Sequence, residues 1–232
     1  MTLPILLVPG LSCTAEIWAR QIPQLWSRGP VTVANHTEGT TMAEIATSIL
    51  ATAPPVFALG GISMGGYLAF EIWRQAPERV KGLALVDTSA RADAPETTKR
   101  RRSAMAVTRA GRFEQIVALA FPITVHPDHV GDPTLLSLHT RMSLAVGADT
   151  YLRHQDAIIT RRDSRPDLQN ITVPSLVIVG DTDQLTPPEY AREMAGALPN
   201  ATLSIIPEAG HMALAEQPDA TNAALMAWLD RL

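Results

Sequence analysis

The sequence predicts an open, doubly wound α/β fold with a mostly parallel sheet, and three observations support this prediction. Six short apolar runs are continuous, which is typical of parallel strands that are covered on both faces. Segments with helical spacing lie between these runs, and such alternation of strand and helix favours a parallel sheet. At 232 residues, of which 46% are hydrophobic, the chain is long enough to bury one sizeable core. The predicted strands are Ile5–Val8, Val31–Ala34, Val56–Leu59, Leu83–Val86, Leu176–Val179 and Leu203–Ile206.

Helices are predicted between the strands from apolar residues that recur at helical spacing. The clearest segment is Thr41–Ala53, in which the apolar residues form one stripe and Thr41 and Glu44 make a capping box. An earlier helix is expected over Ala15–Trp26, where Pro23 should bend the helix or end it early. The remaining predicted helices run from after Ser63 to before Pro77, over Glu189–Leu198 and over Asp219–Leu229.

The alternation of strand and helix breaks between about Ala90 and Pro166, where helical stretches occur without a buried strand. We expect residues 90–165 to form a small helical cap, inserted between two parts of the core at residues 1–89 and 166–232. Its predicted amphipathic helices are Arg112–Leu119 and Ser137–Val146, and an exposed apolar face of the cap would line a pocket. The basic run Lys99–Arg102 is expected to be a solvated helix face.

Composition and charge argue against several classes of partner. Lys and Arg number 19 and Asp and Glu number 23, so no excess of basic residues attracts nucleic acid or an anionic membrane. No apolar run approaches the roughly 20 residues that a membrane-spanning helix needs. The N-terminus lacks the pattern of a signal peptide, and the single cysteine, Cys13, allows neither an intramolecular disulfide nor a cysteine-rich metal site. We therefore expect a cytoplasmic protein that needs no metal ion or organic cofactor.

A predicted strand, a G-x-S-x-G motif and a predicted helix follow one another around Ser63. The serine of such a motif sits on a turn so tight that Gly61 and Gly65 must flank it, and the turn lifts the hydroxyl clear of the sheet. The helix N-terminus behind it provides N–H groups and a positive dipole end for an oxyanion. A loop serine beside helix-packing glycines is the alternative, but the position between strand and helix favours a nucleophile.

A serine hydroxyl becomes a good nucleophile only when a base takes its proton, so a histidine is required. Among the six histidines, His211 follows the last apolar run by one short loop and is therefore predicted at the carboxyl edge of the sheet. A surface loop histidine is the alternative interpretation of His211. His36 follows an early strand. The other four lie in the predicted cap, where surface or pocket-lining roles are expected: His126, His129, His139 and His154.

The histidine in turn needs an acid that holds its tautomer and stabilises its charged form. Asp181 and Asp183 follow one predicted strand, and Asp87 follows another. Asp183 is the preferred acid, because two further residues let its carboxylate reach back toward the imidazole. Either Asp181 or Asp183 could instead cap the following helix. Asp87 remains the alternative acid, since it ends the strand after the nucleophile helix.

The oxyanion of the reaction needs two backbone N–H donors. One donor should be the residue after the nucleophile, Met64, and the other should come from the loop after the first strand, where we predict Leu11. Ser12 could hydrogen-bond the substrate. Cys13 is expected to be a small packed side chain and not a nucleophile.

These motifs together resemble the α/β-hydrolase superfamily, and within it the compact bacterial esterases and enol-lactonases that carry a G-x-S-M-G-G elbow. In that family the acid usually lies three residues after a strand-ending glycine, which matches Asp183 after Gly180. The chain departs from the family in two loops: Pro9 stands where His is frequent, and Asn35–Gly39 replaces a D-x-x-G-x-G-x-S pattern. The matching segments are Val8–Leu11, Gly61–Gly66, Val179–Asp183 with Thr186–Pro187, and Ala209–His211.

The resemblance implies a serine hydrolase that cleaves a small carboxylic ester or lactone through an acyl-enzyme intermediate. A serine at position 63 argues against haloalkane dehalogenase and epoxide hydrolase chemistry, because those relatives place an aspartate there. A thioesterase and a carbon–carbon bond hydrolase remain alternatives on the same residues. A small-molecule receptor with vestigial hydrolase activity is the alternative from another class.

Overall fold

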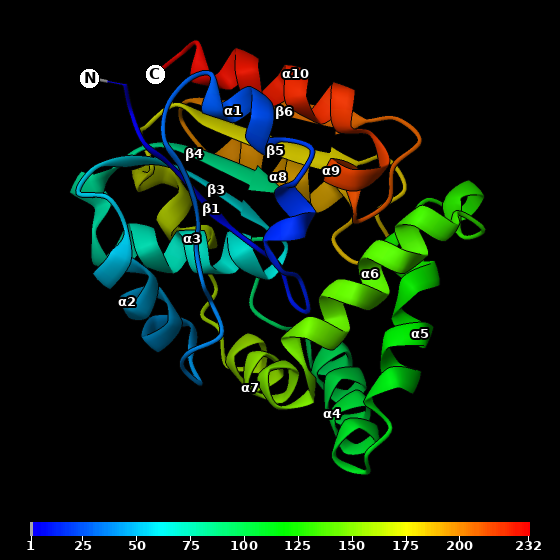
Figure 1. Ribbon diagram of the computed structural model, residues 1–232. Coiled ribbons are helices and arrows are strands. Elements are labelled where there is room, and N and C mark those ends of the chain that lie inside the picture. The colour runs from blue at the N-terminus through cyan, green and yellow to red at the C-terminus, as the bar shows by residue number, and fades with distance from the viewer. Residues whose placement is uncertain (1) are drawn as a thin grey trace.

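The computed structural model describes residues 2–232, so Met1, the first residue of the predicted core segment 1–89, lies outside the described residues. Six strands form one sheet in the order β2-β1-β3-β4-β5-β6, and every neighbouring pair is parallel (Figure 1). The predicted parallel sheet is therefore confirmed. The strands are β1 (Ile5–Val8), β2 (Val31–Val33), β3 (Phe57–Ile62), β4 (Val80–Val86), β5 (Ser175–Gly180) and β6 (Ala201–Ile206).

The two faces of the sheet bury different side chains of the same strands. In β1, Ile5 and Leu7 pack into one core cluster, whereas Leu6 and Val8 pack into the other. Successive residues of a strand point to opposite faces, so a strand that is covered on both sides must be apolar throughout. This is the physical reason for the continuous apolar runs in the sequence.

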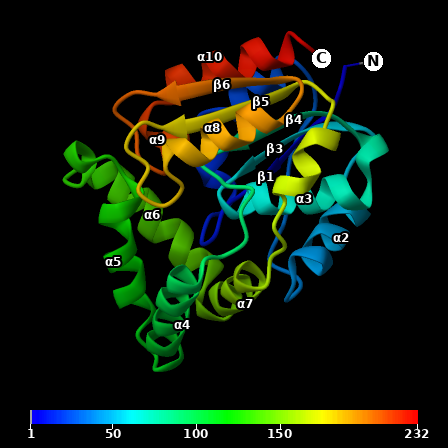
Figure 2. The same cartoon turned by 180° about the vertical axis from the view of Figure 1, so that it is seen from behind.

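Helices cover both faces of the sheet and make the fold doubly wound (Figures 1 and 2). One face carries α2 (Met42–Thr52), α3 (Met64–Gln75) and α8 (Pro188–Ala197), and the other carries α1 (Ile22–Trp26), α9 (Ala213–Glu216) and α10 (Pro218–Leu229). Within residues 2–232, no helix combines the length and the apolar character needed to span a bilayer.

The capping box predicted at the start of α2 is present in a modified form. The Glu44 amide donates to the Thr41 hydroxyl at 3.2 Å, as the prediction requires. The Glu44 carboxylate, however, accepts from the amide and the hydroxyl of Thr40, both at 2.8 Å, one residue earlier than in the standard box. The side chains therefore satisfy amides on both sides of the helix start, which explains why α2 begins at Met42.

The single helix predicted over Ala15–Trp26 is wrong. The structure has a 3-10 helix at Ala15–Trp18 and a separate helix α1 that begins at Ile22. Pro23 does not end a helix but lies in the first turn of α1, where the missing N–H of proline has no helical partner to lose. The break therefore comes before the proline and not at it.

Residues 90–165, all of which the structure describes, contain four α-helices and no strand. We call this stretch the cap segment; it lies beside the carboxyl ends of the strands (Figure 2). The two predicted amphipathic helices correspond to the longer α5 and α6. Of α4, the sequence predicted only the helix face at Lys99–Arg102 and not the length of the helix, because only Met105 and Thr108 of this helix are buried and its apolar periodicity is weak. The four helices are α4 (Pro95–Arg109), α5 (Phe113–Thr124), α6 (Pro133–Val146) and α7 (Ala148–Ile159).

The basic run Lys99–Arg102 lies on α4 and is only in part the solvated face that was expected. Lys99, Arg100 and Arg102 are exposed. Arg101 instead forms an ion pair with Asp93 at 3.1 Å and donates to the Gln155 side chain of α7 at 2.9 Å. One of the four cations therefore ties α4 to its neighbouring segments.

The burial of the strands predicts unequal effects of two leucine substitutions. Leu59 in β3 is 0% exposed, whereas Leu203 in the edge strand β6 is 37% exposed. We expect Leu59→Ala to lower the free energy of unfolding by about 2–5 kcal/mol, because the substitution leaves a cavity in the core. Leu203→Ala should change it by less than about 1 kcal/mol. Urea denaturation followed by circular dichroism measures both, and equal losses would contradict the described layers.

Candidate active site

Ser63 occupies a sharp turn between the end of β3 and the start of α3. Its backbone has φ 54° and ψ −117°, a conformation that costs a serine on the order of 1–3 kcal/mol. Contacts from the end of β4 hold the turn. The Ser63 amide donates to the Val86 carbonyl at 2.9 Å, and the Thr88 hydroxyl donates to the Ser63 carbonyl at 2.7 Å. The strained turn leaves the serine side chain half-buried at the carboxyl end of the sheet.

Two glycines make this turn sterically possible. A Cβ atom on Gly61 would lie 2.3 Å from the Gly65 carbonyl oxygen. A Cβ atom on Gly65 would lie 2.2 Å from the carbonyl oxygen of Val8 in β1. Both distances are far shorter than any real contact, so the G-x-S-x-G motif is required by the close approach of β3, α3 and β1.

His211 reaches Ser63 from the loop after β6. Its Nε2 lies 2.8 Å from the Ser63 Oγ, and its Nδ1 lies 2.8 Å from the Asp183 Oδ2. An ionised carboxylate only accepts hydrogen bonds, so Nδ1 carries the proton and Nε2 accepts from the serine hydroxyl. The structure thus brings together three residues that lie far apart in the sequence, and joins them in one chain of hydrogen bonds.

Asp183 is 3% exposed, and both of its carboxylate oxygens have donors. Oδ1 accepts from the amides of Leu185 at 2.8 Å and Thr186 at 2.9 Å, and Oδ2 accepts from the Thr186 hydroxyl at 2.7 Å and from His211. Burial by itself would raise the pKa of Asp183, but the charge of His211 and these hydrogen bonds hold the pKa below its ordinary value. The carboxylate is therefore ionised beside the imidazole.

The pKa of His211 shifts in the opposite direction. Burial lowers the pKa of the imidazole, but the charge of Asp183 and its hydrogen bond outweigh this effect and raise the pKa above its ordinary value. A raised pKa makes His211 a stronger base toward the Ser63 hydroxyl. The pair therefore has the electrostatics that proton transfer from a serine requires.

Asp181, one of the alternative acids, makes no hydrogen bond to His211 in the described part of the chain. Its exposed carboxylate accepts from the amides of Glu208 at 3.2 Å and Ala209 at 3.3 Å. These amides belong to the turn after β6, so the alternative that Asp181 caps the following helix is wrong. Asp181 instead supports the start of the loop that carries His211.

Asp87, the other alternative acid, is fully buried at the end of β4 and likewise makes no hydrogen bond to His211 within residues 2–232. Its two oxygens accept from the amides of Gly180 at 3.0 Å and Ala213 at 3.2 Å. Burial and the charge of Asp183 raise the pKa of Asp87 to about 8. Asp87 therefore bridges the strand end that leads to Asp183 and the residues that follow His211.

The amides of Leu11 and Met64 are the two predicted oxyanion donors. Within residues 2–232 neither amide donates a hydrogen bond to another group of the chain. The loop that carries Leu11 passes close to Ser63, since a Cβ atom on Gly10 would lie 3.2 Å from the Ser63 Cβ. The Met64 amide is the first of α3, so it too is open at the helix N-terminus.

His36 is a residue of the site region to which the sequence interpretation assigned no role. It is buried, and its Nε2 donates to the Gly10 carbonyl at 3.0 Å. The N–H and C=O of a trans peptide point in opposite directions, so this bond turns the Leu11 amide away from His36. His154 of α7 donates in turn to the His36 carbonyl at 2.9 Å. The pairing of β2 with β1 in the sheet places His36 beside this loop, and no local pattern in the sequence indicates that pairing.

The remaining candidates near the site have less direct contacts. Ser12 follows Leu11 with a φ of 58°. Burial raises the pKa of the Cys13 thiol to about 12, which agrees with a packed side chain and not with a nucleophile. His139 of α6 packs against Phe121, and burial lowers its pKa to about 4, so its imidazole is neutral. No group of three or more His, Cys, Asp or Glu side chains within residues 2–232 is arranged to hold a metal ion.

A family model described as alpha/beta hydrolase fold matches residues 26–218. The chain belongs to the α/β-hydrolase family. Among α/β-hydrolases of known structure, a thermophilic esterase from Thermogutta terrifontis is similar to it, with a TM-score of 0.89 and 30% sequence identity. That similarity covers 98% of this chain and 89% of the esterase chain. Ser63, Asp183 and His211 all lie within the matched region.

Two further relatives are similar in sequence. A protein named non-heme bromoperoxidase BpoC, from Mycobacterium tuberculosis, is 32% identical over 182 residues, which cover 72% of this chain and 65% of that protein. The 3-oxoadipate enol-lactonase 2 of Acinetobacter baylyi is 30% identical over 172 residues, which cover 74% of this chain and 62% of the lactonase. The chain therefore spans slightly less than two thirds of the length of these two relatives.

The packing of the α/β-hydrolase turn predicts a sharp contrast between two glycines. Gly65→Ala places a methyl group against the Val8 carbonyl oxygen, and we expect it to destabilise the fold by about 1–3 kcal/mol and to remove the hydrogen bond between Ser63 and His211. Gly196→Ala is the matched control. Gly196 lies in helix α8, and a Cβ atom there would meet no described atom within 4 Å apart from the nearby backbone of the same helix, so the substitution should stabilise the protein by about 0.5–1 kcal/mol. Thermal unfolding measures both, and two neutral variants would argue against the described turn.

Proposed function

We propose that the protein is a serine hydrolase that cleaves a small carboxylic ester or lactone through an acyl-serine intermediate. The observation that carries the proposal is the hydrogen-bonded chain from Asp183 through His211 to Ser63, with 2.8 Å for each bond to the imidazole. A nucleophile, a base and a group that orients the base have these mutual positions in serine hydrolases. The similarity to a thermophilic esterase and to an enol-lactonase supports the same class of reaction.

In the proposed first step, Ser63 Oγ attacks the carbonyl carbon of the substrate while His211 Nε2 takes the hydroxyl proton. The tetrahedral intermediate then collapses, the alkoxide leaves with the proton from Nε2, and the acyl group remains on Ser63. A water molecule loses a proton to Nε2 and attacks the acyl-serine, which releases the carboxylic acid and restores the hydroxyl. For a lactone the alkoxide and the acyl group belong to one molecule, so the product is a single hydroxy acid.

In this proposal the amides of Leu11 and Met64 stabilise the oxyanion of each tetrahedral intermediate. Both amides are open, and both lie in segments that are held next to Ser63. Fixed N–H donors of this kind stabilise developing negative charge without reorganisation during the reaction. The hydrogen bond from His36 to the Gly10 carbonyl supports the Leu11 assignment, because it fixes the orientation of the peptide that carries this amide.

We assign the wall of the substrate pocket to the cap segment. Phe113 and Val117 of α5 and Tyr151 of α7 form a buried apolar cluster, and Leu11 packs against it. An apolar surface next to an oxyanion donor suits an uncharged acyl group, because a charged group would lose its hydration there. The cap segment therefore determines which acyl groups fit, whereas Ser63, His211 and Asp183 perform the bond cleavage.

A substrate screen separates the proposal from its alternatives. A thioester and a carbon–carbon bond beside a carbonyl present the same electrophilic carbon, so both remain alternative substrates for these residues. We expect multiple turnovers on p-nitrophenyl acetate or butyrate or on simple lactones, and slower turnover on thioesters. A small-molecule receptor with a vestigial site would complete only a few turnovers with every compound, and that result would contradict the proposal.

Removing the nucleophile or the base should abolish turnover without unfolding the protein. Ser63→Ala is expected to retain at most a few per cent of the ester hydrolysis, and His211→Ala should behave alike. The loss in the double variant should not exceed that of either single variant, because the residues act as one unit. Initial rates on p-nitrophenyl butyrate test this, with circular dichroism as the folding control. Substantial activity in Ser63→Ala would move the nucleophile elsewhere.

The acid assignment can be tested with three aspartate-to-asparagine variants. Asp183→Asn should lower kcat on the order of 10⁴-fold, because the imidazole is then held in the wrong tautomer. Asp181→Asn should retain most of the activity, since this carboxylate is exposed and, within residues 2–232, accepts hydrogen bonds only from the amides of Glu208 and Ala209. The assignment would move to Asp87 at the end of β4 on one outcome: a folded Asp183→Asn variant has a kcat within tenfold of wild type, whereas a folded Asp87→Asn variant loses nearly all of its activity.

A further inference from the structure

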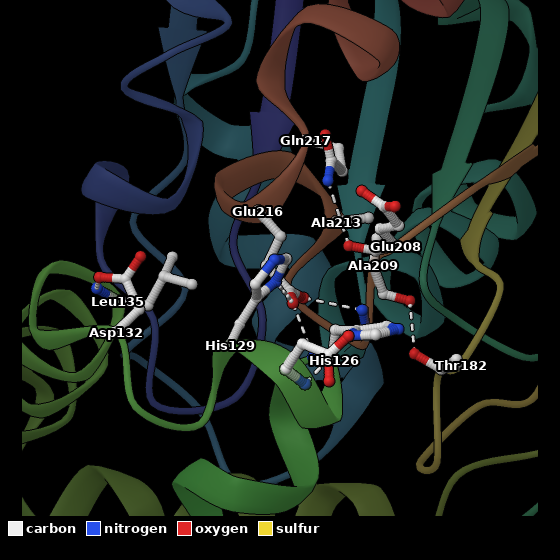
Figure 3. Close-up of polar contacts among 12 residues, drawn as sticks. His126, His129, Asp132, Leu135, Thr182, Glu208, Ala209, Ala213, Glu216 and Gln217 are labelled. Carbon is white, nitrogen blue, oxygen red and sulfur yellow. Dashed lines mark hydrogen bonds and ion pairs between the residues drawn. The ribbon is translucent and has the colours of Figure 1, made fainter.

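A second buried carboxylate, that of Glu216, lies beside the loop that carries His211. Glu216 is the last residue of α9, and its side chain is 0% exposed. Its Oε1 accepts from the Gly210 amide at 2.9 Å. Its Oε2 accepts from the His126 amide at 2.6 Å and from the His129 Nδ1 at 2.8 Å (Figure 3). Three donors from two separate parts of the chain therefore converge on this one side chain.

The donors come from opposite sides of the boundary between the cap segment and the rest of the fold. His126 and His129 belong to the stretch between α5 and α6, whereas Gly210 directly precedes His211. An ionised carboxylate is costly to bury unless hydrogen bonds replace its hydration. Glu216 therefore needs both groups of donors, and it holds the cap segment and the His211 loop at a set distance from each other.

The backbones of the two segments are in direct contact at the same place. A Cβ atom on Gly210 would lie 2.5 Å from the Val125 carbonyl carbon and 2.7 Å from the His126 nitrogen. No side chain fits between the cap segment and the loop at this point. Any displacement of the stretch around His126 would therefore press on Gly210 or pull away from it.

The short segment that carries His211 is held at both ends by buried carboxyl groups. Glu216 accepts from the Gly210 amide before the histidine, and Asp87 accepts from the Ala213 amide after it. Of these two anchors, only Glu216 also binds the cap segment. The position of the imidazole thus depends on how the cap segment is seated.

We propose that Glu216 is a positioning residue that couples the cap segment to His211, so that the seating of His126 and His129 on its carboxylate sets the alignment of the imidazole with Ser63. This inference rests on the proposed function. The charge of Glu216 also acts on the histidine, since it contributes with Asp183 and Asp87 to the raised pKa of His211. Glu216 therefore has a mechanical effect and an electrostatic effect on the base, and each can be measured.

Glu216→Gln tests both effects. The glutamine amide has one acceptor oxygen and places an NH₂ group against one set of donors. The side chain therefore loses its hydrogen bonds either to Gly210 or to the cap segment. We expect kcat on p-nitrophenyl butyrate to fall about 10- to 100-fold with KM within threefold, because a misaligned base slows the chemical step. The pKa of His211, followed by NMR titration in a Ser63→Ala background, should move downward because a negative charge has been removed. Glu208 is an exposed glutamate near the same loop, so Glu208→Gln is the matched control. It should change neither kcat nor the pKa of His211.

A pair of substitutions at His129 tests the hydrogen bond that the cap segment donates to Glu216. The His129 side chain is 27% exposed, so its replacement should leave the fold intact. The two His129 variants therefore still test the proposal if Glu216→Gln does not fold. His129→Leu removes the donor and should lower kcat at least fivefold, whereas His129→Gln retains an N–H donor and should stay within twofold of wild type. Glu216→Gln and His129→Leu should also combine non-additively, because the two residues share one interaction.

The results that overturn the inference differ from those that overturn the proposed function. If wild type turns over p-nitrophenyl butyrate but Glu216→Gln matches Glu208→Gln in kcat and in the His211 titration, the coupling is absent. Equal rates for His129→Leu and His129→Gln would overturn it likewise. If wild type itself shows no turnover and no labelling of Ser63 by a fluorophosphonate, the proposed function fails instead, and the NMR titration still reports whether Glu216 acts on His211.

Discussion

The backbone conformation of Ser63 is the constraint on which the rest of the site depends. A serine adopts a φ of 54° here only because β1, β4 and α3 enclose the turn so closely that neighbouring positions have no room for a side chain. With Oγ placed at the carboxyl edge of a parallel sheet, the groups that lie next to it come from loops at the carboxyl ends of other strands of the sheet. The loop after β1 brings Leu11, the loop after β5 brings Asp183, and the loop after β6 brings His211.

Buried carboxyl groups give these loops their rigidity. The carboxyl groups of Asp183, Asp87 and Glu216 are removed from water, and each accepts from two backbone amides of neighbouring segments. Asp183 and Glu216 accept from side-chain donors as well. A buried carboxylate without such donors would cost several kcal/mol, so a loop that supplies donors cannot move without exposing an uncompensated charge. The same groups therefore adjust the pKa of His211 and determine where it lies.

Two departures from the common motifs of the family meet in space. Proline replaces histidine at position 9, and Asn35–Gly39 replaces the usual glycine-rich pattern after the second strand. In the structure His36 from the second segment donates to the Gly10 carbonyl of the first, and His154 from the cap segment donates to His36. The loop with the Leu11 amide is therefore supported from the side, and the cap segment contacts both this loop and the one that carries His211.

Local patterns in the sequence were sufficient for the parallel sheet, for most of its helices and for the turn at Ser63. Each of these features depends on residues close together in the chain: a continuous apolar run, a helical stripe, or glycines beside a serine. Only the tertiary structure decided which aspartate approaches His211, because Asp87, Asp181 and Asp183 all follow strand ends and differ in the direction of their side chains. The roles of His36 and Glu216 were equally hidden, since their partners lie 26 and 90 positions away. Such contacts arise from the packing of loops against one another, which no local periodicity records.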